Sequence, residues 1–287
     1  MAALWLKPGR EKSVQQRRPW IFSGAIDHLE GDPGAGETVA VYAADRTPLG
    51  WAAYSPQSQI RARIWSWASA EKIDPEFFRR RIRSALARRN ALNLEPQTTA
   101  CRLVHAESDG LPGLVVDRYA DVLVIQFLSA GAEHWRSVII DVLEAETGLS
   151  HLYERSDVEV RRLEGLPEQT GWLRSPGPTG IEILENGLRF KVDVAVGQTT
   201  GFYLDQRNNR ARVGALSAGR DVLNCFCYTG GFTLYALAGG ASSVLSVDSS
   251  GEALAQGAEN LVLNGPFPGA SDWLEGDVFQ LLRKFRD

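Results

Sequence analysis

Residues 221–250 constrain the fold of this chain more than any other stretch. Residues 221–226 form a short apolar run typical of a buried parallel strand, and residues 228–231 (YTGG) follow with the composition of a tight turn. Apolar residues then recur at helical spacing up to the glycine pair at 239–240, and a second apolar strand closes on Asp248. The stretch therefore predicts a β-loop-α-β unit with an acidic residue at the tip of its second strand.

The position of Asp248 indicates a ligand. It lies about twenty residues beyond the glycines, the separation at which a strand-tip carboxylate can accept hydrogen bonds from both hydroxyls of a ribose. Ser249 and Glu252 have the spacing of a capping box for a helix that Gly265 ends. The loop is not G-x-G-x-x-G, so a purely structural turn explains it equally well, and Asp248 could simply begin a helix. With Asp248 included, the unit favours an adenosine-containing cofactor.

The composition indicates a globular protein with two or three domains, because 44% of the 287 residues are hydrophobic and 23% are charged. No apolar run approaches the roughly twenty residues of a membrane span, and the N-terminus lacks the features of a signal peptide. We therefore expect a cytoplasmic protein that contacts no membrane. The three cysteines predict no disulfide framework, and His105, His134 and His151 lack metal-ligand spacing, so no metal is expected.

The N-terminal third is basic. Residues 1–90 carry 15 Lys and Arg against 9 Asp and Glu, whereas the remainder carries 16 against 26. This asymmetry favours a module that faces a polyanion, although a chance surface distribution would also produce it. Short alternating runs predict a small β-barrel, in which Arg17, Arg18 and Trp20 form a basic and aromatic cluster suited to unpaired RNA bases. The alternative is that Trp20 and Phe22 fill the barrel interior.

A helix predicted over residues 74–92 has one apolar face and one face that is nearly all arginine. Like charges without acidic partners one turn away repel one another unless a phosphate backbone is near. This makes Arg79, Arg80 and Arg83 candidate RNA contacts. A solvated helix face is the equally consistent alternative.

Three domains are predicted. A small β-barrel covers residues 1–70, the arginine-rich helix and an α+β module cover 71–185, and part of a Rossmann-like α/β domain covers 186–287. Within the second, we expect a helix at about 133–147, and the Pro- and Gly-rich residues 165–180 predict a linker or surface loop.

Two further groups of polar residues bear on a cofactor site. Asp205, Arg207 and Arg210 follow an aromatic segment, where they could cap the next helix and form structural ion pairs, or could line the pocket. Asp277 lies at the expected tip of a third strand. An acid there suits the exocyclic amine of adenine.

At GFYLDQR (201–207), VLNCFCYTGGFTLYAL (222–237), SVDSS (246–250) and GDVF (276–279) the chain resembles the bacterial large-subunit ribosomal RNA cytosine-C5 methyltransferases that carry an N-terminal PUA domain. The resemblance covers essentially the whole length, since RRPWIFSGAI resembles the PUA segment of that family and SDGLPGLVVDRY its central domain. It implies a class I, Rossmann-like methyltransferase domain with S-adenosylmethionine as cofactor and ribosomal RNA as partner. Whether the protein is a homodimer stays open.

The resemblance also implies roles for individual residues. The loop from Phe226 to Gly230 would hold the methionine end of the cofactor, Asp248 the ribose and Asp277 the adenine. The predicted cofactor-binding residues are Phe202, Asp205, Arg207, Asn224, Phe226, Tyr228, Thr229, Gly230, Asp248, Ser249 and Asp277.

Two features depart from the family pattern. Thr199 stands where relatives commonly have a lysine, and neither the Asp-Pro-Pro motif nor the Ser-Cys-Ser motif that bears the nucleophile occurs before Asp287. We therefore expect a truncated chain, inactive alone, whose catalytic residues lie beyond Asp287. Cys225 and Cys227 are interpreted as core residues under the cofactor loop, and not as the nucleophile.

Two other functions would use the same features. A nucleotide-dependent oxidoreductase is disfavoured because the loop lacks the third glycine required close to a pyrophosphate. An RNA-binding module would keep the cofactor fold only as a scaffold. The sequence favours an RNA cytosine-C5 methyltransferase over both.

Overall fold

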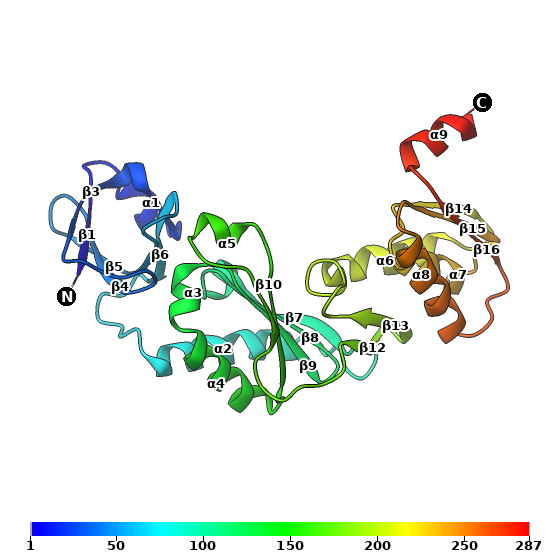
Figure 1. Ribbon diagram of the computed structural model, residues 1–287, viewed down its shortest axis with the longest axis horizontal. Helices are drawn as coiled ribbons and strands as arrows, with labels where there is room; N and C mark the ends of the chain where they lie inside the picture. Colours follow the sequence, from blue (N-terminus) through cyan, green and yellow to red (C-terminus); the bar gives the residue numbers. More distant parts are fainter. Residues whose placement is uncertain (1, 287) are drawn as a thin grey trace. The chain divides into compact units, whose positions relative to one another are not determined.

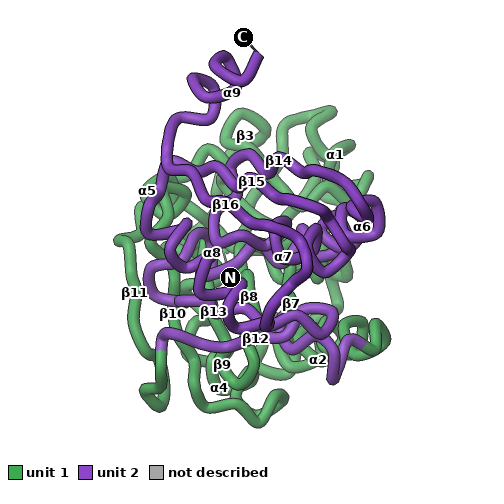
Figure 2. The backbone as a smooth tube through the Cα atoms, turned by 90° about the vertical axis from the view of Figure 1, so that its right-hand side faces the viewer, with its two compact units in different colours: residues 1–93, 101–178 green, residues 94–100, 179–287 purple. Residues whose placement is uncertain are grey.

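The computed structural model describes residues 2–286, which divide into two compact units (Figure 2). Unit 1 contains the residues up to Asn93 together with Cys101–Pro178. Unit 2 contains Leu94–Ala100 and the residues from Thr179 onward. Among the described residues, no helix is long and apolar enough to cross a membrane.

The N-terminal part of unit 1 is a curled six-stranded sheet in the order β2-β6-β5-β4-β1-β3 (Figure 1). Its elements are β1 (Ala3–Leu6), α1 (Lys12–Gln15), β2 (Trp20–Phe22), η1 (Ser23–Ala25), β3 (Ile26–Glu30), β4 (Thr38–Tyr42), β5 (Pro48–Tyr54) and β6 (Ile60–Ser66). Alternating residues of these strands, such as Val39 and Val41, are fully buried in one apolar core. The predicted small β domain is therefore present.

The alternative in which Trp20 and Phe22 fill the interior of this domain is wrong. Their side chains are 44% and 52% exposed, whereas Ile21 between them is 2% exposed. Because successive side chains of a strand point to opposite faces, the burial of Ile21 forces both aromatic rings outward.

The second part of unit 1 is a five-stranded sheet in the order β11-β10-β9-β8-β7, with helices packed against it (Figure 1). Its elements are α2 (Pro75–Asn90), β7 (Ala100–His105), η2 (Ala106–Asp109), β8 (Leu114–Tyr119), β9 (Val122–Phe127), α3 (Ala130–His134), α4 (Arg136–Thr147), β10 (His151–Ser156), α5 (Val160–Leu163) and β11 (Gln169–Trp172). The helix expected near 133–147 is thus two helices that meet at Trp135, and the expected loop at 165–180 contains a strand.

A buried carboxylate joins the two parts of unit 1. Glu164 is 2% exposed, and its Oε1 accepts a hydrogen bond of 2.8 Å from the Arg63 guanidinium of β6. Its Oε2 accepts from the hydroxyl of Ser55 at 2.8 Å and from the backbone N–H of Ala130 at 3.1 Å. Such a charge is tolerated in the interior because every partner is supplied by the fold.

Unit 2 contains a hairpin and an all-parallel three-stranded sheet in the order β14-β15-β16. Its elements are β12 (Gly180–Glu185), β13 (Leu188–Asp193), η3 (Leu204–Gln206), α6 (Arg207–Leu216), β14 (Asp221–Cys225), α7 (Gly231–Ala238), β15 (Ser243–Asp248), α8 (Gly251–Leu263), β16 (Ala270–Glu275) and α9 (Val278–Arg286). The predicted β-loop-α-β unit is confirmed as β14-α7-β15. The N-cap of α8 is Ser250, which accepts from the N–H of Ala253, and not Ser249 as expected.

Candidate cofactor site

The loop between β14 and α7 carries unusual backbone geometry. Phe226 and Tyr228 have φ angles of 57° and 49°, in a region that residues with side chains rarely adopt. Gly230 has φ 75°, and a Cβ there would lie 2.6 Å from the Trp273 ring. Strained backbone of this kind persists only where the surrounding structure holds it, and it concentrates at ligand-binding loops.

Asp248 holds this loop. Its Oδ2 accepts a hydrogen bond of 2.8 Å from the backbone N–H of Tyr228, and its Oδ1 accepts one of 3.0 Å from that of Ser250. The half-buried carboxylate thus connects the end of β15 to the loop after β14 and to the start of α8. Each carboxylate oxygen has a second lone pair, so Asp248 can still accept hydrogen bonds from a ribose.

The inner side of the loop offers a polar group to a ligand. Thr229 is 2% exposed, and its hydroxyl has no hydrogen-bond partner within the part of the chain that the structure describes. Its carbonyl accepts from the amide of Asn260 at 3.1 Å. A buried hydroxyl without a partner is costly unless a ligand supplies one, so the loop fits a polar cofactor.

Aromatic side chains stand at the open end of the sheet. Phe226 is 62% exposed and meets the ring of Phe279 edge to face, with centroids 5.7 Å apart. The exposed Asp277 caps α9 by accepting from the N–H of Gln280 at 2.8 Å. Two rings beside a carboxylate suit a flat, amine-bearing base such as adenine. Phe279 was not predicted as a site residue, although it belongs to the GDVF segment on which the resemblance rests.

The segment before α6 contacts the loop between β14 and α7. Phe202 is buried between Phe190 and the Arg210 guanidinium, which lies 4.5 Å from the Phe202 ring centroid. Arg210 forms a buried ion pair of 2.6 Å with Glu185, so its structural role is the one that the structure supports. Tyr203 meets Tyr228 edge to face at 5.8 Å, which connects this segment to the strained loop.

The remaining predicted residues lie around the same unit. Asn224 donates to the hydroxyl of Thr233 at 2.9 Å and thereby joins β14 to α7. Asp205 is exposed and accepts from the amide of Gln206, whereas Arg207 is half-buried at the start of α6. Ser249 is exposed beside Asp248.

The two cysteines beside the loop differ in exposure. Cys227 is 4% exposed, and burial, together with the nearby charge of Asp248, raises the pKa of its thiol to about 12. Cys225, on β14, is half-buried. The burial of Cys227 confirms its interpretation as a core residue.

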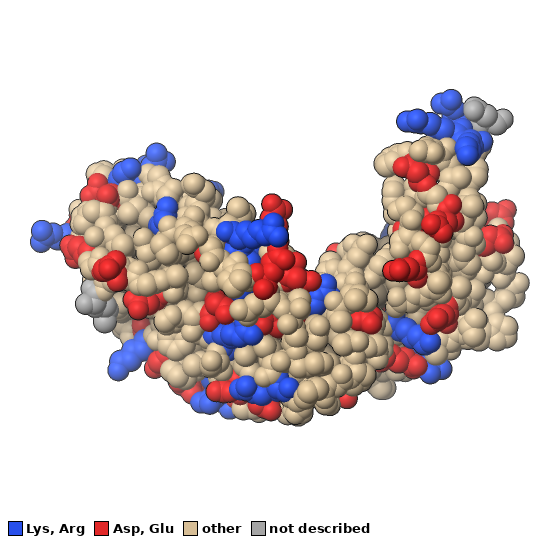
Figure 3. Space-filling model, in the orientation of Figure 1, with Lys and Arg blue, Asp and Glu red and all other residues tan. Residues whose placement is uncertain are grey.

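The arginines of α2 are all paired, which corrects the expectation that they lack acidic partners. Arg79 and Arg83 bind Glu146 at 3.5 Å and 2.6 Å. Arg80 binds Glu71 at 3.0 Å, and the others on this face bind Glu71 or Asp109. Most of these partners lie on distant segments or before the helix, and Arg79 also pairs with Glu76 of α2 at 2.8 Å. On the face of unit 1 that Figure 3 shows, basic and acidic side chains are interspersed in the same way.

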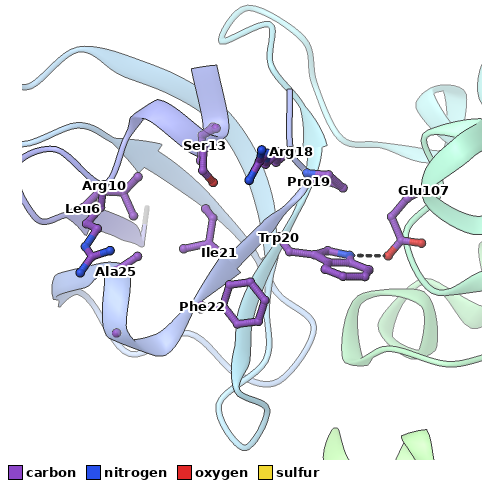
Figure 4. A pocket seen from close by; sticks show the side chains of 12 residues that line it. Leu6, Arg10, Ser13, Arg18, Pro19, Trp20, Ile21, Phe22, Ala25 and Glu107 are labelled. Carbon is purple, nitrogen blue, oxygen red and sulfur yellow. Dashed lines mark hydrogen bonds between the residues drawn. The ribbon is translucent and has the colours of Figure 1, made fainter. Parts of the chain in front are cut away.

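The basic residues of the N-terminal sheet differ from those of α2. Arg17 and Arg18 are exposed, and the Arg17 guanidinium lies 5.3 Å from the ring centroid of Trp67. Arg18 and Trp20 line a surface pocket together with Glu107 (Figure 4).

Comparisons with known proteins agree with this geometry. Residues 156–287 match the family model of S-adenosylmethionine-dependent methyltransferases, and residues 4–67 match that of PUA-like domains. The fold and the site therefore define an S-adenosylmethionine-dependent methyltransferase with an N-terminal PUA-like domain. This class excludes the oxidoreductase alternative.

Whole-length relatives narrow the class. The chain is 50% identical over 283 residues to ribosomal RNA large subunit methyltransferase I of Shewanella amazonensis, covering 98% of this chain and 72% of the relative. It is 47% identical over 288 residues to the protein of that name from Aeromonas hydrophila, covering 100% of this chain and 72% of the relative. The chain belongs to the ribosomal RNA large subunit methyltransferase I family.

Solved structures show the same fold. A candidate S-adenosylmethionine-dependent methyltransferase from Streptococcus mutans superposes with a TM-score of 0.85 at 24% identity, covering 100% of this chain and 73% of that one. A second candidate methyltransferase, solved in complex with S-adenosylhomocysteine, gives a TM-score of 0.86 at 23% identity over the same share of each chain.

Proposed function

We propose that this protein transfers the methyl group of S-adenosylmethionine to C5 of a cytosine in large-subunit ribosomal RNA. The observation that carries the proposal is the strained loop at Phe226–Gly230, held by Asp248 at the open end of a parallel sheet. The relatives that share nearly the whole chain are named for methylation of this RNA. A substrate of this kind places the protein in the cytoplasm.

Different described residues bind different parts of the cofactor. Asp248 accepts hydrogen bonds from the ribose, and Asp277 with the rings of Phe226 and Phe279 receives the adenine. The orphaned Thr229 hydroxyl and the loop backbone face the methionine end. When bound, the cofactor supplies an electrophilic methyl group.

The chemistry of cytosine sets a further requirement. C5 becomes nucleophilic only after a thiolate adds at C6. Once C5 carries the methyl group, a base must remove the C5 proton so that the thiolate can leave. Cys227 does not meet this requirement because its thiol is buried and protonated. The predicted nucleophile lies outside the described residues.

The test is to map the product. Labelled methyl groups from S-adenosylmethionine are offered to protein-free large-subunit RNA together with a chain that also contains the predicted nucleophile, and the modified nucleoside is then identified by mass spectrometry. 5-Methylcytosine supports the proposal, and a methyl group on a purine or a ribose contradicts it. RNA binding by a chain with no affinity for S-adenosylhomocysteine would favour the RNA-binding module instead.

A further inference from the structure

A pocket of about 710 Å³ opens on unit 1 beside β2 (Figure 4). Its wall combines apolar side chains such as Leu6 and Pro19 with Arg10, Arg18 and the exposed rings of β2. Glu107 of η2 forms the opposite side. The volume falls in the usual range for sites that bind small ligands.

The two rings of this pocket are placed for stacking. Trp20 and Phe22 occupy the same face of β2, so their Cα atoms are separated by about 6.6–6.8 Å along the strand. The indole N–H of Trp20 donates a hydrogen bond of 2.8 Å to Oε1 of Glu107. This bond holds the Trp20 ring in place while 44% of its surface stays exposed, so a stacking partner meets a preorganised ring.

Cations gather around the same pocket. Residues 7–18 contain Lys7, Arg10, Lys12, Arg17 and Arg18, with Glu11 as the only acid. Across residues 2–286, none of these five cations forms an ion pair with an acidic side chain, whereas every arginine on the charged face of α2 does. Cations without acidic partners beside exposed rings match a phosphate backbone with a base splayed out of it.

We propose that this pocket binds one unpaired nucleotide of the RNA substrate. The base stacks on Trp20 and Phe22, and Arg10 and Arg18 face the phosphates. A duplex cannot occupy the site, because its base faces are already stacked. The proposal rests on the proposed function only for the identity of the macromolecule.

Glu107 gives the pocket a base preference. One of its oxygens holds Trp20, and the other is an acceptor with no hydrogen-bond partner recorded in the described chain. An ionised carboxylate can only accept hydrogen bonds. It therefore favours bases with an exocyclic amine (cytosine, adenine and guanine) over uracil.

The test compares binding of single-stranded heptanucleotides and of a matched duplex by filter binding across a salt series. Trp20→Ala is expected to weaken single-strand binding by about 5- to 150-fold, with the salt dependence nearly intact. Arg10→Gln with Arg18→Gln is expected to lower the slope of log affinity against log salt by about 1.4. Glu107→Gln keeps an acceptor for Trp20 and is expected to reduce the discrimination against oligouridine.

Matched controls separate binding from folding. Arg80→Gln removes an arginine that Glu71 already neutralises, and Phe285→Ala removes an exposed ring from unit 2, so both are expected to bind RNA as wild type does. Trp20→Phe keeps a stacking ring and is expected to recover most of the affinity. Thermal melts of all variants exclude misfolding as the cause of any loss.

The outcomes also separate this pocket from the proposed function. Suppose that the wild type binds large-subunit RNA fragments and that neither Trp20→Ala nor the double variant of Arg10→Gln with Arg18→Gln changes this binding. That result overturns the pocket alone. No binding of any RNA by the wild type overturns the ribosomal substrate as well. Trp20-dependent binding of an acidic peptide, with RNA binding independent of Trp20, identifies the pocket as a protein-binding site and overturns the proposal.

Discussion

Replacing Asp248 by Ala tests the cofactor site most directly. The variant loses the acceptor for the ribose hydroxyls and releases the backbone N–H groups of Tyr228 and Ser250, now held at 2.8 Å and 3.0 Å. A hydrogen bond to a charged group contributes about 1.5–3 kcal/mol, so we expect affinity for S-adenosylhomocysteine to fall by about 10- to 150-fold. Loss of the hydrogen bond between Asp248 and the Tyr228 N–H also frees the strained loop, which should lower the affinity further.

The assay is calorimetric titration with S-adenosylhomocysteine, accompanied by a thermal melt. Asp221→Ala is the matched control, because Asp221 is an exposed acid at the opposite end of β14 that bonds only to Ser243 in the contacts recorded for the described chain. Asp248→Asn keeps one acceptor oxygen and should fall between the two. An Asp248→Ala affinity within twofold of wild type would refute the ribose assignment.

Three other perturbations test the surrounding structure. Gly230→Ala places a Cβ 2.6 Å from a ring at φ 75° and should lower both the melting temperature and cofactor affinity, whereas Gly219→Ala, at φ 68° with no atom within 4 Å, should cost only backbone strain. Burial raises the pKa of the Cys227 thiol from 9.0 to about 12, so between these pH values the folded state holds a proton that the unfolded state releases. The free energy of unfolding should therefore fall as pH rises from 9 to 12. Cys227→Ala should flatten that fall in a series of denaturant melts. Glu164→Gln leaves Arg63 buried without its counter-charge and should cost about 3–5 kcal/mol of unfolding free energy in urea melts; a loss below 1 kcal/mol would mean that the pair is not needed.

Local patterns allowed the cofactor unit to be predicted. Strand, turn and helix in residues 221–250 each follow from periodicity and glycine placement within a few neighbours, and Asp248 follows from its spacing along the chain. The cap of α8 was missed by one residue because Ser249 and Ser250 are chemically equivalent there. Which serine caps depends on backbone angles that composition does not encode.

Contacts between distant residues could not be predicted. Arg83 pairs with Glu146, 63 positions away, and Trp20 with Glu107, 87 positions away. No pattern within a helix or strand reveals such partners, so the arginines of α2 resembled an RNA contact. Arg18 and Trp20 were predicted as part of an RNA-binding cluster, but the contribution of Glu107 to their pocket was not. The outward direction of Trp20 depends on which face of β2 meets the core, and Ile21 decides that.

The joint at Glu164 limits how this protein can be divided for experiments. A fragment ending after β6 would keep Arg63 and Ser55 but lose their carboxylate, and it would also lose Glu107 from the pocket beside Trp20. The complementary fragment would keep Glu164 but lose its partners Arg63 and Ser55. The PUA-like domain is thus recognisable from its sequence, but its buried contacts depend on the rest of unit 1. Swapping it between relatives will succeed only if the recipient supplies an acid equivalent to Glu164.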